Sequence, residues 1–427
     1  MSLFAIMKPV LHIEVLQKPS SHLLKDEVLE LVRPFVMDCV VLSPSTDYHT
    51  LASFDYYPIL KEHVLVIRCS ETETDAPVIA DEAELIFYVY KLNPSGVETP
   101  EAGTHTCEET GEEFAISHIR TLPSEDFQGL WESLIFDNQI KQDIVRFVEA
   151  AFEFKDHDLD SNIAGWNRVV LFHGPAGSGK TSLCRALAQK LSIRLADRFS
   201  QTRLIEINAH ALVSTWFAES GKSVSRLLEQ LREMMEDPRM LLCVLVDEVE
   251  SLACTRQASL SGVEPSDSIR AVDALHTQLD RLRHRPNALV LTTSKVTDAI
   301  DVAFVDRADI KRLIGPPSAS AAYAILRSCC CELMTRGLLA PREPLFELYY
   351  LEAVRFTVMQ PLKTSLRLWN VACEAARRGL SGHELRRLPF LAYAWHMRDD
   401  KRPVVFMKAL AAAVRDSLLD VATLHRN

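Results

Sequence analysis

The sequence predicts an α/β protein in which a parallel sheet with helices on both faces follows a small α+β domain and precedes an all-helical region. Three observations predict this fold. Short β-leaning runs, separated by Pro, Ser, Asp and Asn, fill the first ninety residues. From Leu122, helical periodicity alternates with apolar strands, which is typical of a parallel sheet. After Gly315 the strand patterns stop and helical periodicity continues to the end.

Composition narrows the class of protein. The 427 residues are 48% hydrophobic and 25% charged, which is typical of a soluble globular chain of two or three domains. The formal charge of −11 and the absence of a Lys/Arg block argue against direct nucleic acid binding. No uncharged stretch is long enough to span a membrane, and the N-terminus does not resemble a signal peptide.

The ten cysteines contain no CxxC pair, which favours a reducing compartment. Cys184 and Cys243 lie inside apolar patterns, where a free thiol behaves as a small hydrophobic group. Cys329, Cys330 and Cys331 would point in three directions from a helix, so we interpret them as core residues rather than as metal ligands.

The domain boundaries follow from these changes of pattern. We expect an N-terminal α+β domain over residues 1–95, an acidic linker or loop over 96–121, a large α/β domain over 122–315 and a helical domain over 316–427. The linker assignment depends on six glutamates with no lysine or arginine among them, which indicates a solvated segment. A binding role is the alternative. The glutamates are Glu98, Glu101, Glu108, Glu109, Glu112 and Glu113.

A phosphate-binding loop is the strongest motif. The apolar strand RVVLFH runs into GPAGSGKTS, which matches GxxxxGK[ST], and apolar residues then recur at helical spacing. Glycines let backbone N–H groups converge on phosphate oxygens at a helix N-terminus. Lys180 supplies a positive charge for the β and γ phosphates of ATP, and the Thr181 hydroxyl is a ligand for Mg²⁺. A glycine turn that binds nothing is the alternative. The predicted nucleotide-binding residues here are Gly174, Pro175, Ala176, Gly177, Ser178, Gly179, Lys180, Thr181 and Ser182.

A second buried strand, MLLCVLVDEVESL, ends in the adjacent carboxylates Asp247 and Glu248. Buried charges are costly without a cation or partner, so a pair of acids at a strand end indicates a site. We predict that Asp247 holds Mg²⁺ through its waters and that Glu248 polarises the attacking water. A helix cap is the alternative for an isolated DE pair.

A third buried strand, ALVLTTS, ends in polar residues before Lys295, and its position in the chain predicts that its tip lies between the first two. Arg307 follows in a polar turn after an apolar helical stretch. An arginine there can act as a finger for a neighbouring subunit's γ phosphate, or it can be an exposed salt-bridge residue.

These pieces in this order, followed by a helical lid, resemble an AAA+ ATPase. The segments HGPAGSGKTSLCRALAQKLSIRL, VLVDEVESL, IDVAFVDRADIK, IGPPSA and GLSGHELRRLPFLAYA are similar to the pachytene checkpoint protein 2 family over about residues 118–400. The resemblance implies a P-loop ATPase core, a C-terminal helical lid and an N-terminal domain that recognises substrate.

The resemblance also implies a function. Members of the family form homo-hexameric rings that use ATP to unfold part of HORMA-domain proteins, converting them from a closed to an open state in spindle checkpoint silencing and meiosis. An adaptor with a HORMA domain often delivers the substrate. We therefore expect a location in nucleus and cytoplasm, including chromosomes and kinetochores. Trp216 and Phe217 fall where such rings grip a polypeptide in the central channel, although both can instead tuck into a core. EPSDSIR, residues 264–270, resembles a second channel loop.

Two positions depart from the family. Relatives carry asparagine at Lys295, where it orients the attacking water as sensor 1; lysine has no acceptor but can approach the γ phosphate as a point charge. We hypothesise that Lys295 holds ATP firmly and positions water poorly. Relatives carry the sensor 2 arginine at His383, and a mostly neutral histidine supplies less charge to the nucleotide. Arg386 and Arg387, one turn on, are possible substitutes.

Three functions compete at this stage. The first is an active AAA+ remodeller, which the catalytic residues favour. The second is a nucleotide-binding HORMA scaffold with weak or no hydrolysis, because sensor 1 is replaced by Lys295; Glu248 argues against it. The third is a clamp-loader-like DNA ATPase, which the net charge disfavours and which salt-dependent DNA binding would revive.

Overall fold

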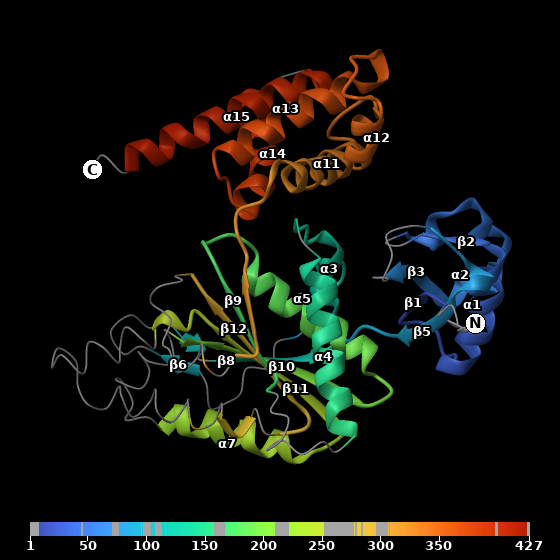
Figure 1. The fold of residues 1–427 in the computed structure, drawn as a ribbon, viewed down its shortest axis with the longest axis vertical. Helices are drawn as coiled ribbons and strands as arrows, with labels where there is room; N and C mark the ends of the chain where they lie inside the picture. The colour runs from blue at the N-terminus through green and yellow to red at the C-terminus, as the bar shows by residue number, and fades with distance from the viewer. Residues whose placement is uncertain are drawn as a thin grey trace, which may run out of the picture.

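The computed structural model describes residues 8–43, 46–70, 77–94, 96, 104–106, 113–115, 117–137, 139–157, 167–209, 222–251, 277, 280–282, 285–295, 306, 308–397 and 400–424. Over these residues the chain forms an N-terminal α+β unit, a central sheet covered by helices and a C-terminal helical unit (Figure 1). No helix among them has both the length and the apolar character needed to cross a membrane.

The N-terminal unit is a three-stranded sheet with helices on one face. Its strand order is β3 (Val64–Ser70), β1 (Val10–Gln17) and β5 (Glu84–Tyr90), with β1 antiparallel to β3 and parallel to β5. Because side chains alternate along a strand, Leu11, Ile13 and Val15 enter one core with α1 (Lys25–Asp38) and α2 (Pro58–His63). Glu14 therefore belongs to the opposite face. A short pair, β2 (Val41–Leu42) and β4 (Val78–Ile79), lies outside this sheet.

The central sheet has six strands in the order β13 (Ile310–Leu313), β9 (Val169–His173), β12 (Ala288–Ser294), β11 (Met240–Asp247), β10 (Gln201–Asn208) and β8 (Ser117–Leu122). Five strands are parallel, as predicted, and β12 lies between β9 and β11, as predicted.

The strand β8 differs from the predicted parallel sheet, because it pairs antiparallel with β10. Residues 117–121 were assigned to the acidic linker, but they belong to the sheet. A short edge strand of mixed polarity, SHIRTL, has no continuous apolar run to reveal it. The hairpin of β6 (Thr104–Thr106) and β7 (Glu113–Ala115) also falls in the predicted linker.

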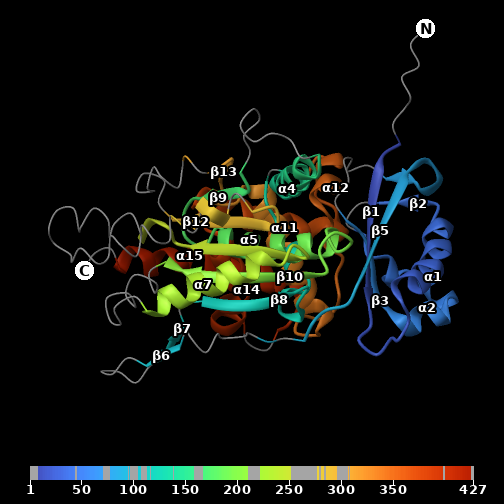
Figure 2. The same ribbon diagram turned by 90° about the horizontal axis from the view of Figure 1, so that it is seen from below.

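Helices cover both faces of the central sheet, as predicted. In β11, Leu241, Cys243 and Leu245 pack in one core with α4 (Ile140–Asp156) and α5 (Lys180–Arg194). The alternate residues of β11 pack with α7 (Lys222–Glu236) on the other face, where α7 runs along the sheet in Figure 2. Both faces of β11 are buried, which explains its unbroken apolar sequence. Cys184 and Cys243 are fully buried, which confirms their interpretation as core residues.

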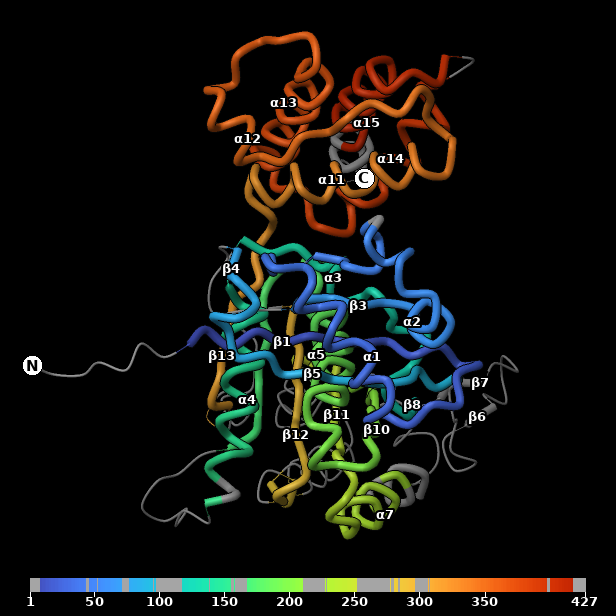
Figure 3. Tube along the Cα trace, turned by 90° about the vertical axis from the view of Figure 1, so that its right-hand side faces the viewer, coloured from blue at the N-terminus to red at the C-terminus, as the bar shows by residue number. Residues whose placement is uncertain are grey.

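The C-terminal unit consists of helices and their connections, with no strand among its described residues. It contains α11 (Ala319–Thr335), α12 (Leu348–Ala353), α13 (Lys363–Arg377), α14 (Gly382–His396) and α15 (Pro403–Leu424), which share one core that includes Cys330. Figure 1 shows this lid above the central sheet, and Figure 3 shows β1, β3 and β5 lying across α5.

Candidate active site

The phosphate-binding loop joins the end of β9 to the start of α5. Gly174, Gly177 and Gly179 have φ values of 138°, 73° and 98°, which side chains other than glycine rarely adopt. The surroundings also require glycine: a Cβ on Gly174 would lie 2.3 Å from the carbonyl oxygen of Ile314. The glycines that the motif specifies are therefore needed for the shape of the loop.

Lys180, the first residue of α5, folds back over this loop. Its Nζ donates hydrogen bonds to the carbonyl oxygens of Gly174 and Pro175, at 2.8 and 2.7 Å. Burial is the main effect on Lys180 and lowers its pKa below the usual lysine value, while Glu250 and Asp247 act in the opposite direction. A cation held within the loop is well placed to meet phosphate oxygens.

The predicted magnesium ligands, Thr181 and Asp247, lie side by side. Thr181 Oγ1 donates to Asp247 Oδ1 at 2.9 Å, and Thr293 Oγ1, from the end of β12, donates to the same oxygen. Three strand or helix ends therefore converge on one carboxylate. Hydroxyl and carboxylate oxygens are the ligands that Mg²⁺ prefers, so these residues fit the ion.

Glu248, the predicted catalytic base, follows β11 with a backbone φ of 61°. Its backbone N–H donates to Thr293 Oγ1 at 3.2 Å. Its carboxylate oxygen Oε1 lies 2.5 Å from Lys295 Nζ, and the two side chains are 37% and 47% exposed. The hydrogen bond to Glu248 is the main effect on Lys295 and raises its pKa. In this structure Lys295 therefore contacts Glu248, the predicted catalytic base, and this contact was not predicted from the sequence.

The lid reaches the phosphate-binding loop through its backbone. The helix α14 begins with a capping box of Ser381 and Glu384, and the His383 N–H donates to the carbonyl oxygen of Gly177 at 3.1 Å. A Cβ on Gly177 would lie 2.8 Å from Ser381 Oγ. Arg386 donates to the carbonyl oxygen of Ser133, so it is not merely solvated.

A cavity of about 270 Å³ gathers these groups. Its lining includes the loop from Ala176 to Ser182, both acids, Thr293, Lys295, His383 and Arg386. A second cavity of about 270 Å³ shares the loop residue Ser178 and extends along residues 313–317. Phosphates, a metal ion and an attacking water all have residues of suitable chemistry in the first cavity, which can therefore hold and hydrolyse a nucleoside triphosphate.

Sequence reasoning missed the apolar wall of this cavity. Leu134, Ile135 and Phe136, which precede α4, line it together with Ile325 of α11. An apolar wall suits the flat base of a nucleotide. The run LIF, which fits neither the helical nor the strand period, is the signal in the sequence that marks this wall.

Several predicted site residues lie outside the described part of the chain. They are the finger candidate Arg307, the channel residues Trp216 and Phe217, and the second channel loop at residues 264–270.

Sequence models of three known domains match the chain. The model of the ATPase family associated with various cellular activities (AAA) matches residues 170–316. The TRIP13 N-terminal domain matches residues 6–95, and the TRIP13-like AAA+ ATPase lid C-terminal domain matches residues 318–418.

Whole proteins are similar as well. The pachytene checkpoint protein 2 homolog of Mus musculus is 40% identical over 417 residues, which cover 95% of this chain and 93% of the relative. The homolog of Danio rerio is 40% identical over 426 residues, which cover 98% and 96% of the two chains.

Among solved structures, PCH-2 of C. elegans has a TM-score of 0.75 at 30% identity and covers 96% of this chain and 99% of its own. The E. coli MS115-1 HORMA:CdnC:Trip13 complex contains a chain with a TM-score of 0.50 at 17% identity, which covers 69% of this chain and 94% of its own. That second likeness concerns the fold alone.

Proposed function

Because the chain belongs to the pachytene checkpoint protein 2 family and is an AAA+ ATPase, we propose that it uses ATP to convert HORMA-domain proteins from a closed to an open state. Family membership over 95% of the chain supports this function. The bacterial Trip13 relative, which is described in a complex with a HORMA protein, supports the same class of partner.

The observation that carries the proposal is the assembly of Lys180, Thr181, Asp247 and Glu248 in one cavity. In this proposal Lys180 binds the β and γ phosphates, and Thr181 and Asp247 hold Mg²⁺. The metal supplies charge neutralisation at the phosphates when bound. Glu248 orients water and accepts its proton, and the lid closes over the nucleotide through His383 and Arg386.

The oligomeric state, the substrates and the location are inferred from the family. We propose a homo-hexamer in which Arg307 serves the neighbouring subunit's nucleotide and Trp216 and Phe217 grip the substrate. We propose HORMA proteins of the spindle checkpoint and the meiotic chromosome axis as substrates, delivered by a HORMA-domain adaptor. The activity would then belong to the nucleus and cytoplasm, with no direct contact to nucleic acid.

The test uses the purified full chain, ATP and a closed HORMA protein that holds a fluorescent partner peptide. We expect ATP-dependent release of the peptide, measured as a fall in anisotropy. Trp216→Ala with Phe217→Ala is expected to keep ATP hydrolysis and lose release, because gripping and hydrolysis use different residues. Hydrolysis without release from any checkpoint or axis HORMA protein, with and without adaptor, would contradict the proposal.

The contact between Lys295 and Glu248 favours a second candidate, a nucleotide-bound HORMA scaffold with slow hydrolysis. A glutamate paired with a cation at 2.5 Å is less available to accept a proton from water. The pair is also the reason to prefer a base-blocking role for Lys295 over a phosphate-binding role.

Steady-state hydrolysis by Lys295→Asn distinguishes the two candidates. Negligible wild-type turnover that Lys295→Asn restores would identify the scaffold. Measurable wild-type turnover that Glu248→Gln abolishes would identify the motor. Nucleotide binding is measured for each variant, so that a loss of turnover is not mistaken for a loss of affinity.

A further inference from the structure

The face of the N-terminal sheet that points away from its own core carries charged residues beside apolar ones such as Leu16 and Val66. Leu11, Ile13 and Val15 of β1 face α1, so Glu14, between them, faces the central unit. The Glu14 side chain is only 5% exposed although it belongs to a carboxylate. A buried carboxylate requires a partner, because its desolvation is costly.

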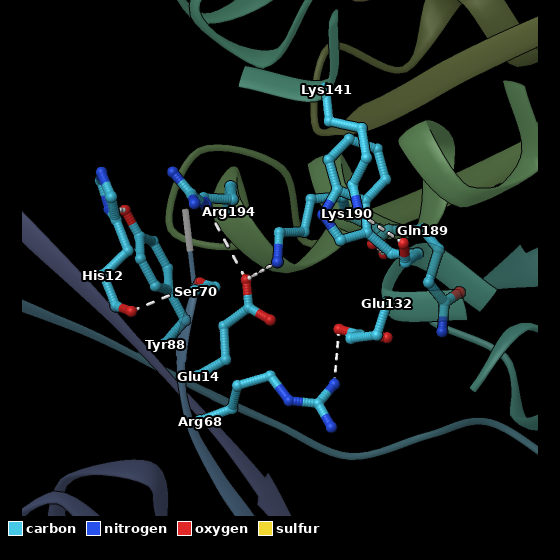
Figure 4. Close-up of polar contacts among 12 residues, drawn as sticks. His12, Glu14, Arg68, Ser70, Tyr88, Glu132, Lys141, Gln189, Lys190 and Arg194 are labelled. Atoms are coloured by element: carbon cyan, nitrogen blue, oxygen red, sulfur yellow. Dashed lines mark hydrogen bonds and ion pairs between the residues drawn. The ribbon is translucent and has the colours of Figure 1, made fainter. Parts of the chain in front are cut away.

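The partners come from the last turn of α5. Lys190 Nζ lies 2.6 Å from Glu14 Oε1, and Arg194 Nε lies 3.8 Å from the same oxygen. Lys190 and Arg194 are four residues apart, so they share one face of the helix, and each is 2% exposed. Figure 4 shows Lys190 directed at Glu14 and Arg194 beside it, with its Nε side towards the carboxylate; we call these three residues the Glu14 cluster.

Neighbouring contacts extend the cluster to other elements. Arg194 Nη1 lies 3.5 Å from Glu149 of α4, and the Arg194 guanidinium lies 5.5 Å from the centre of the Tyr88 ring of β5. A second ion pair crosses the same interface, between Arg68 of β3 and Glu132 of α3 (Leu130–Ser133), at 2.6 Å.

Packing across this interface leaves a gap beside the ion pairs. A cavity of about 110 Å³ lies between the N-terminal sheet and the helices, and Glu14, Arg68 and Lys190 are among the residues that line it. An interface with such a gap loses packing contacts, so ion pairs contribute more of its specificity.

The position of the cluster links it to the nucleotide site. The helix α5 begins at Lys180 in the phosphate-binding loop, and Lys190 lies about 15 Å further along the same helix. Most residues of α5 are buried, so the helix connects its two ends as one rigid element. We propose that the Glu14 cluster holds the N-terminal domain on the P-loop helix, and that Glu14 is thereby a positioning residue that couples N-terminal docking to nucleotide affinity.

Coupling of this kind is reciprocal: if docking favours nucleotide binding, nucleotide must favour docking. The first test is hydrogen exchange of the wild-type full chain with and without ADP. We expect slower exchange in the phosphate-binding loop and also in β1. Protection confined to the loop would overturn the proposal, and this measurement requires no variant to fold.

The second test uses Glu14→Gln, which removes the negative charge of the side chain and keeps its shape. We expect faster exchange in β1 and at residues 189–195, and a loss of about fivefold in affinity for a fluorescent ATP analogue. The double variant Glu14→Lys with Lys190→Glu restores an ion pair and is expected to recover affinity. Asp55→Asn is the control, because it breaks an exposed pair with Lys61 in the same domain and is expected to match the wild type.

Two results of the second test would overturn the proposal. One is wild-type exchange and affinity in Glu14→Gln. The other is faster hydrogen exchange in β1 with wild-type nucleotide affinity. The cluster would then hold the N-terminal domain in place without influencing the phosphate-binding loop. Neither readout involves a HORMA protein, so both results are independent of the proposed substrate.

Discussion

Two lysine–glutamate pairs of almost equal length lie in different surroundings. Lys295 lies 2.5 Å from Glu248 at the nucleotide site, and Lys190 lies 2.6 Å from Glu14 under the N-terminal domain. The first pair is about half exposed and the second is almost fully buried. Water screens the first pair, which therefore opens at a cost of about 0–1 kcal/mol, whereas breaking a buried pair leaves a charge without solvent. The same lysine–glutamate chemistry therefore gives an ion pair that is easily broken at the nucleotide site and one that is costly to break under the N-terminal domain.

The largest effect on ATP turnover is expected from replacing Glu248, the predicted base, by a neutral side chain of the same shape. In Glu248→Gln, ATP turnover should fall by about 10²–10⁴-fold, because the amide cannot accept the proton of the attacking water. The unfolding midpoint should not change, since the broken pair is exposed. Steady-state hydrolysis and thermal unfolding measure the two effects. Glu233→Gln, on the exposed surface of α7, is the control, and turnover within threefold of wild type in Glu248→Gln would contradict the assignment.

The buried pair should show the opposite behaviour. In Glu14→Ala, the free energy of unfolding of the N-terminal unit should fall by about 3–5 kcal/mol, because Lys190 and Arg194 lose a buried counter-charge. Urea denaturation of the full chain, followed by hydrogen exchange in β1, measures the loss. Asp55→Asn should cost about 0–1 kcal/mol at its exposed pair. A loss below about 1 kcal/mol in Glu14→Ala would remove the contrast between the two pairs.

Releasing Glu248 from its lysine should have a moderate effect. In Lys295→Asn, turnover should rise about two- to fivefold, which corresponds to the free energy of one exposed ion pair. Steady-state hydrolysis at saturating ATP measures the change. Lys295→Ala separates release of the base from orientation of water, because alanine provides only the first. A fall in turnover in both variants would show that Lys295 assists hydrolysis.

The smallest effect is expected on the lid. In His383→Arg, affinity for ATP should rise about twofold, since a permanent charge enters the exposed lip of the cavity where solvent screens it. Titration with a fluorescent nucleotide measures the change. His396→Arg, at the other end of α14, is the matched control. Equal affinities and turnover for His383→Arg and wild type would count against a role for this position in sensing nucleotide.

Local patterns in the sequence predicted much of the central unit. The phosphate-binding loop follows from its glycines and Lys180, and the order of β9, β12 and β11 follows from three apolar runs with polar ends. These features depend on residues close together in the chain, whose spacing reflects strand and helix geometry.

Contacts between distant residues could not be predicted in the same way. Nothing local pairs Glu14 with Lys190, because only the docking of two domains brings them together. The edge strand β8 was missed since its sequence lacks an apolar run. The approach of Lys295 to phosphate stays a prediction. Its contact with Glu248, which the turn after β11 brings within reach, was not predicted.

The hydrogen bond from the His383 N–H to the Gly177 carbonyl oxygen has an evolutionary consequence. A contact made by backbone atoms is inherited with the fold, whatever side chain occupies the position. Among the twenty amino acids only proline lacks the N–H and would remove it. We therefore expect that lineages can exchange the side chain at residue 383 by genetic drift while this hydrogen bond between lid and loop is retained.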